Sequence, residues 1–107
     1  NEIGIVAPGH GLSERNEEMA MWGLDVQQVR QLSSQLNQKA TEIENALTQL
    51  TNLLGSTQWD GPDATAFRND WSGQHTSALR QVIQALRDAA TKAQQNANQQ
   101  EQVSNAN

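Results

Sequence analysis

Two long segments with the same hydrophobic repeat, joined by seven residues, constrain the fold of this 107-residue chain more than any other feature. Residues 24–54 and 62–97 both carry apolar side chains at alternating steps of three and four residues. Such a repeat, about 3.5 residues long, is typical of α-helices that pack along their length. The joining residues 55–61 end in Trp59-Asp60-Gly61, where the chain must reverse. The sequence therefore predicts an all-α fold, an antiparallel two-helix hairpin with a tryptophan at its tip.

Local signals and the repeat together define the first helix, which we expect to span residues 25–54. Asp25 is the expected N-cap, and Gln28, three residues later, completes a capping box. Gly55 is expected to end the helix in the left-handed conformation. The seam that faces the second helix is predicted to consist of Val26, Val29, Ser33, Leu36, Ala40, Ile43, Leu47, Leu50 and Leu54.

The second helix is expected to span residues 62–97, with Pro62 at its first position. Its first apolar stripe is predicted to complete the core and consists of Ala64, Phe67, Trp71, His75, Ala78, Val82, Ala85 and Ala89. A second stripe beside it consists of Leu79, Ile83, Leu86, Ala90, Ala93 and Ala97. One stripe is enough to pack on the first helix, so a second subunit is predicted to cover the surplus in a four-helix bundle, over Leu79, Ile83, Leu86 and Ala90. Gly73 indicates either a kink or a tight interhelical contact.

Both ends of the chain fall outside the predicted hairpin, which is taken to cover residues 22–97. Residues 1–21 are interpreted as an irregular N-terminal arm, either a flexible leader or an element that packs on the hairpin. Residues 98–107 are mainly Gln and Asn and are interpreted as a polar C-terminal tail. A lone two-helix hairpin of this size buries little surface, which also favours a partner subunit.

Charge and composition argue against several classes of function. The chain has 7 Lys and Arg against 12 Asp and Glu, a net charge of -5, and no basic run with interleaved aromatics, so nucleic acid and anionic membranes are poor partners. No segment approaches the roughly 20 apolar residues of a membrane span, so no membrane insertion is expected. Cysteine is absent, and no nucleophile with a base, acid pair or glycine loop stands out. We therefore expect no enzymatic activity, no cofactor and no metal site, and we interpret His75 as a packing residue.

Trp59 and Gly61 are the residues at the turn to which we assign a role. A tryptophan left in a short turn would expose a large apolar ring, so Trp59 is expected to fold onto the helix ends or to reach a partner. The two interpretations, a hydrophobic plug that closes the end of the bundle and a recognition surface, stay open at this point and can coexist. Gly61 supplies the backbone freedom that the bend needs.

The hairpin with Trp59-Asp60-Gly61 at its turn, Phe67 and Trp71 shortly after it, an acidic balance and no signal peptide resembles the WXG family. These are the small early-secretory-antigen-like proteins of the type VII (ESX) secretion pathway in Gram-positive bacteria and mycobacteria. The resemblance covers residues 24–103. It implies a non-enzymatic dimer, with itself or with a related Trp-x-Gly protein, that the secretion ATPase exports folded. The protein would be secreted or held at the cell surface, as an effector, a surface factor or an obligate partner of other substrates.

The resemblance also implies a bipartite export signal, of which this chain carries one half. In the family, the Trp-x-Gly turn of one protomer lies beside a Tyr-x-x-x-Asp/Glu motif behind the second helix of the other. Trp59 and Gly61 match the turn, but the chain has no tyrosine; Glu101 stands at the acidic position and Ala97 four residues before it. Either the tail carries a variant signal or a heterodimer partner supplies the tyrosine. The alternative function is a cytosolic coiled-coil adaptor or structural protein, in which Trp59 only closes the hairpin.

Overall fold

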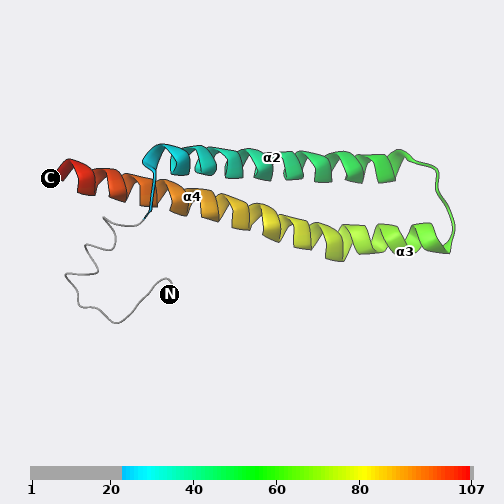
Figure 1. The fold of residues 1–107 in the computed structure, drawn as a ribbon. Helices are drawn as coiled ribbons and strands as arrows, with labels where there is room; N and C mark the ends of the chain where they lie inside the picture. Colours follow the sequence, from blue (N-terminus) through cyan, green and yellow to red (C-terminus); the bar gives the residue numbers. More distant parts are fainter. Residues whose placement is uncertain (1–22, 107) are drawn as a thin grey trace, which may run out of the picture.

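The structure, a computed structural model that describes residues 23–106, is an all-α hairpin of two antiparallel rods (Figure 1). The first rod is α2 (Val26–Ser56). The second rod consists of α3 (Pro62–Asp70), a π-helical turn η1 (Trp71–His75) and α4 (Thr76–Ala106), which follow one another without a break. The described residues contain no strand. The fold class predicted from the sequence, an all-α helical hairpin, is confirmed.

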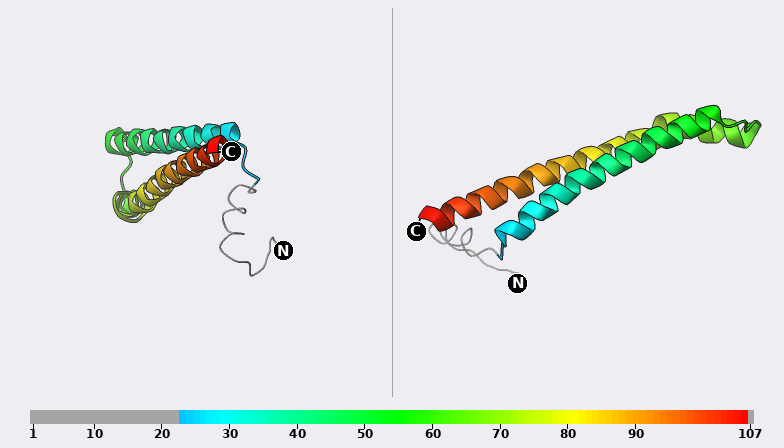
Figure 2. Two further views of the ribbon diagram at one scale, coloured as in Figure 1. Left: turned by 90° about the vertical axis from the view of Figure 1, so that its left-hand side faces the viewer. Right: turned by 90° about the horizontal axis from the view of Figure 1, so that it is seen from above.

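The hairpin is a slender rod with a thin core. Its radius of gyration is 21.3 Å, whereas a compact chain of this length has one of about 13 Å. The rods lie side by side along their length and cross at a slant, as the two views of Figure 2 show together. The buried apolar residues form a single line between them: Ala40, Leu47, Ala64, Trp71, Ile83, Ala90 and Ala97.

The start of α2 confirms the predicted cap, but its end differs from the prediction. The carboxylate of Asp25 accepts a hydrogen bond of 3.0 Å from the backbone N–H of Gln28. The predicted stop at Gly55 is wrong, because the helix continues to Ser56 and ends at Thr57 in an extended conformation, with φ -94° and ψ 129°. Side-chain donors satisfy the terminal carbonyls, so no left-handed glycine is needed there.

The second rod begins where the sequence predicts and ends later. Gly61 has φ 112°, a conformation that side chains disfavour, and Pro62 opens α3 as predicted. The predicted polar tail at residues 98–107 is wrong for its described part, since α4 runs to Ala106. Polar residues in this last stretch reach back to the first rod: the Arg30 guanidinium donates to Asn98 Oδ1 at 2.9 Å and to Glu101 Oε1 at 2.6 Å. The predicted arm at residues 1–21, and Trp22 beside it, lie outside the described residues.

The π-helical turn decides which residues of the second rod face α2. At its end the N–H of Thr76 donates to the carbonyl of Trp71, five residues earlier, so the turn contains one residue more than an α-helical turn. Each residue added to a helix rotates everything after it by about 100°. Gly73 lies in this turn, and no atom within 4 Å would meet a Cβ there, so the predicted alternative of a tight interhelical contact is wrong.

The rotation exchanges the two predicted stripes of the second rod. Val82, predicted in the core, is 46% exposed, while Ile83 and Ala90, predicted at a dimer interface, are 7% and 1% exposed within the hairpin. Leu79 and Leu86, also assigned to that interface, are half-buried. After η1 the seam toward α2 therefore consists of Thr76, Leu79, Ile83, Leu86, Ala90, Ala93 and Ala97.

The seam of α2 follows the prediction except near its C-terminal end. Leu47 is buried, and the half-buried predicted core residues are Val29, Leu36, Ile43 and Leu54. The assignment of Leu50 to the core is wrong, because its side chain is 38% exposed. Leu50 lies on the flank of α2 rather than at the contact line. On the second rod, Phe67 is half-buried and Trp71 is buried, as expected of core residues.

Candidate functional site

The tip of the hairpin carries the exposed tryptophan that the sequence singles out. Trp59 lies in the turn between α2 and α3 and is 41% exposed. Its ring centroid is 6.2 Å from that of Phe67, and the Arg68 guanidinium carbon is 5.7 Å from the Trp59 centroid. The indole therefore rests partly on α3 and leaves the remainder of its surface to solvent. This arrangement accommodates both a plug and a recognition surface.

Arg68 organises the tip, and the sequence reasoning did not identify it. Its Nε and Nη2 groups donate to the carbonyl of Leu54 at 3.2 and 2.9 Å, and Nη2 also donates to the carbonyl of Thr57 at 2.9 Å. Its Nη1 group donates to the carbonyl of Trp59. One side chain of α3 thus binds the end of α2 and the turn. A signal was available in the sequence, because Arg68 is the only lysine or arginine between Lys39 and Arg80.

A row of aromatic rings continues from the tip into the rod. Phe67 stacks on Trp71 with centroids 6.3 Å apart and an interplanar angle of 20°. Trp71 is anchored to α2, because its Nε1–H donates to Thr51 Oγ1 at 2.9 Å. The His75 ring lies 6.2 Å from Phe67 and 6.5 Å from Trp71. Its predicted place in the seam is wrong, since η1 turns it outward and leaves it exposed.

Among residues 23–106, no group of three His, Asp or Glu side chains is placed to hold a metal ion.

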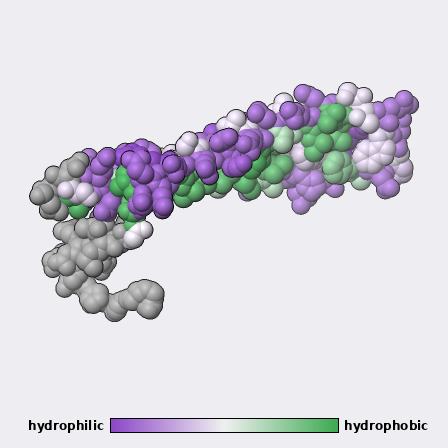
Figure 3. Space-filling view, turned by 45° about the horizontal axis from the view of Figure 1, so that its top comes forward, coloured by the Kyte–Doolittle hydropathy of each residue, from purple (hydrophilic) through white to green (hydrophobic). Residues whose placement is uncertain are grey.

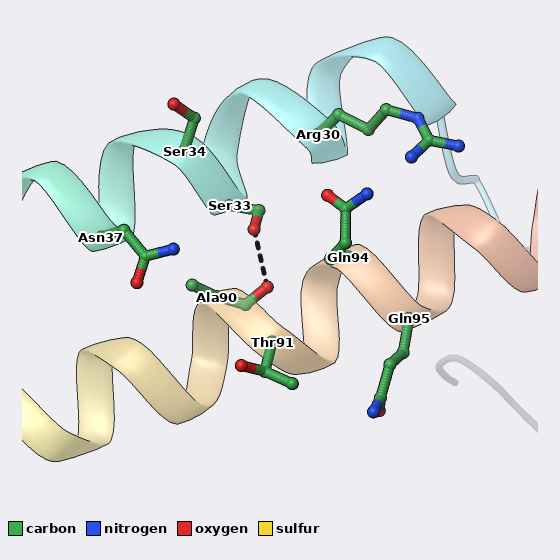
Figure 4. A pocket seen from close by; sticks show the side chains of 8 residues that line it. All are labelled: Arg30, Ser33, Ser34, Asn37, Ala90, Thr91, Gln94 and Gln95. Carbon is green, nitrogen blue, oxygen red and sulfur yellow. Dashed lines mark hydrogen bonds between the residues drawn. The ribbon is translucent and has the colours of Figure 1, made fainter.

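A shallow polar groove follows the opposite half of the hairpin, between α2 and α4 (Figure 4). The buried Ser33 hydroxyl donates to the carbonyl of Ala90 at 2.7 Å and so satisfies the one polar side chain of the α2 seam. The other lining residues are Arg30, Ser34, Asn37, Thr91, Gln94 and Gln95. Arg30 already binds Asn98 and Glu101. The groove therefore offers amide and hydroxyl groups to a ligand, and its one cationic side chain, Arg30, is already paired.

The two long sides of the hairpin differ, because most exposed apolar side chains lie on one of them, beside the Lys39–Glu42 ion pair, and the other is polar. The polar side carries the cross-helix ion pairs Arg30–Glu101, at 2.6 Å, and Arg87–Glu44, at 3.2 Å. The exposed apolar side chains lie roughly 80–140° around each helix from its seam, and in an antiparallel pair these flanks fall on the same side. We call this surface the apolar face; it consists of Leu32, Ala46, Leu50, Leu53, Val82 and Ala89. Hydrophobic surface runs as a broken band along the rod (Figure 3).

The two residues assigned to a degenerate tail signal lie within α4. Ala97 is fully buried in the seam, and Glu101 forms the ion pair with Arg30. Both positions therefore take part in helix packing, and an aromatic side chain at position 97 would have to displace α2.

No helix among the described residues is long and apolar enough to span a bilayer.

No protein-family model, no curated protein and no solved structure matches this chain.

Proposed function

We propose that this chain is a small non-enzymatic protein exported by type VII secretion, as an effector, a surface factor or a partner of other substrates. The observation that carries the proposal is the tip, where Gly61 adopts φ 112° and Trp59 is 41% exposed at the reversal of a two-helix hairpin. This is the position of the Trp-x-Gly turn in the WXG family, which the sequence resembles.

The way in which Trp59 is held supports a role in recognition. An exposed indole combines a large apolar surface with one hydrogen-bond donor, and such rings are frequent at the centre of protein interfaces. Trp59 rests against Phe67 and Arg68, so a partner would meet an already ordered ring. Binding to an ordered side chain costs less conformational entropy than binding to a mobile one. The secretion ATPase is the proposed partner at this surface.

A second subunit is proposed to cover the apolar face. This face takes the place of the interface residues predicted from the sequence, because Ile83 and Ala90 are buried within the hairpin. Leu53, the most exposed leucine of the face at 58%, and Val82 extend the face across both rods. A second copy of the chain or a related Trp-x-Gly protein would complete a four-helix bundle there. The thin core of the isolated hairpin supports such an assembly.

Export is the experiment that tests the proposal. The chain is expressed in the organism that encodes it, in strains with and without the secretion ATPase, and is quantified in cells and culture supernatant. We expect the protein in the supernatant of the ATPase-containing strain only. Trp59→Ala should reduce the exported fraction at unchanged cellular level, whereas Gln58→Ala, a change at the neighbouring exposed turn residue, should not.

Two results would contradict the proposal. The first is retention of the wild-type chain in the cytosol of both strains, which would favour the cytosolic adaptor. The second is equal export of Trp59→Ala and wild type, which would reduce Trp59 to a plug at the end of the hairpin. Thermal unfolding of Trp59→Ala, measured in parallel, separates loss of recognition from loss of fold.

A further inference from the structure

We infer that Arg68 is the positioning residue of the tip, and that its forked guanidinium fixes the orientation in which Trp59 is presented. Three backbone carbonyls, those of Leu54, Thr57 and Trp59, accept hydrogen bonds from this one side chain. These carbonyls belong to the end of α2 and to the turn, whereas Arg68 belongs to α3. The guanidinium therefore joins the segments before, within and after the reversal of the chain.

The end of α2 needs a donor from elsewhere in the molecule. A helix leaves its last four carbonyls without partners inside the helix, and a left-handed glycine motif, a side-chain donor or water satisfies them. The last turn of α2 has no basic residue, and its cap residue Thr57 is extended rather than left-handed. The hydroxyls of Ser56 and Thr57 both donate to the carbonyl of Leu53, at 3.4 and 2.6 Å, and to no later carbonyl. Arg68 supplies the missing donors to Leu54 and Thr57.

The same guanidinium also sets the position of the indole. Its carbon lies 5.7 Å from the centroid of the Trp59 ring, within the range of a cation–π contact, and its Nη1 group binds the Trp59 carbonyl. Phe67, the residue before Arg68 on α3, gives the Trp59 ring an aromatic contact, with the two ring centroids 6.2 Å apart. Backbone and ring of Trp59 are thus held by one side chain. A lysine carries the same charge but has neither the planar fork nor a flat face for the ring.

The consequence for function rests on the proposed role of Trp59 in export. If the secretion machinery binds an ordered indole, then releasing Trp59 from Arg68 should weaken recognition although Trp59 itself is unchanged. Arg68→Lys is the variant that separates geometry from charge. Arg80→Lys is its matched control, because Arg80 is an exposed arginine on α4 in the same rod.

The test combines a measurement on the purified protein with a measurement of export. Nitrogen-15 relaxation of the Trp59 indole N–H reports the order of the ring, and its signal is assigned from the spectrum of Trp59→Phe. We expect an order parameter near 0.85 in wild type and Arg80→Lys, and below about 0.6 in Arg68→Lys. Circular dichroism should show the same helix content in all three proteins. Export of Arg68→Lys should fall to the level of Trp59→Ala, and export of Arg80→Lys should equal that of wild type.

The outcomes separate this inference from the proposed function. An ordered indole in Arg68→Lys would overturn the positioning role, whatever the export result. A mobile indole with normal export, in a strain where Trp59→Ala blocks export, would overturn the claim that recognition needs the ring to be held by Arg68. If Trp59→Ala is exported normally, the proposed function fails, and the relaxation data still decide whether Arg68 positions the ring.

Discussion

Deletion of Gln74 from the π-helical turn tests whether this turn sets the register of the hairpin. η1 contains one residue more than an α-helical turn, and Gln74 is exposed within it. Without Gln74, η1 would become a regular α-helical turn. Trp71 and Ile83 would still lie on the same seam, because the extra residue of η1 and the rotation that it causes are both removed. We therefore expect a change in the free energy of unfolding of less than about 1 kcal/mol, the scale of an ordinary surface substitution.

Deletion of Gln84, an exposed glutamine in the regular part of α4, is the matched control. This deletion would shift the register of the rest of α4 by one residue. The seam positions of the half-buried Leu86 and of Ala90, Ala93 and Ala97 would then be taken by Arg87, Thr91, Gln94 and Asn98. At about 0.8 kcal/mol for each buried methyl group and 1.5–3 kcal/mol for a fully buried leucine, the loss is about 3 kcal/mol or more. If η1 became a regular α-helical turn in this variant, Leu86 and the three alanines would return to the seam. Ala78 and Val82 would then take the seam positions of Leu79 and Ile83, which costs about 2–4 kcal/mol. The Gln84–Asp88 surface hydrogen bond adds about 0.5 kcal/mol or less.

Thermal unfolding followed by circular dichroism, at one fixed protein concentration, distinguishes the two deletions. A change of 1 kcal/mol shifts the Tm of a domain this size by about 4–8 °C, so removal of Gln84 should lower it by about 10 °C or more. Removal of Gln74 should change it by less than about 8 °C, in either direction. Equal destabilisation by both deletions would refute the reasoning, because η1 would then not be the source of the register.

Three further predictions concern single substitutions. Ile83→Ala should cost about 2–4 kcal/mol in urea unfolding and Val82→Ala less than about 1 kcal/mol, and the reverse order would mean that α4 keeps the register expected from the sequence alone. Gly61→Ala should cost about 1–3 kcal/mol because φ 112° with ψ 173° is a glycine conformation. Gly55→Ala, inside α2, should stabilise by up to about 1 kcal/mol; equal effects of the two alanines would refute this backbone argument. Leu53→Glu should convert a dimer to monomer in sedimentation equilibrium, and an unchanged mass would remove the apolar face as the subunit contact.

The sequence by itself determined the elements of this fold, because their signals are local. The heptad repeat required two long helices, Asp25 with Gln28 placed the start of the first, and Gly61 with Pro62 placed the start of the second. Each of these signals depends on a few neighbouring residues and needs no contact with a distant segment. The position of Trp59 at the tip follows from the same signals, and so the sequence alone indicates the candidate site.

Only the tertiary structure decided the phase of the second rod and the construction of the tip. Two stripes competed for the seam, and packing selected Leu79, Ile83 and Leu86 over Ala78, Val82 and Ala85, since the larger side chains bury more apolar surface and offset an irregular turn. The cap that Arg68 provides joins residues up to 14 positions apart in the chain. Such choices depend on the summed energy of contacts between distant segments, which no local pattern contains.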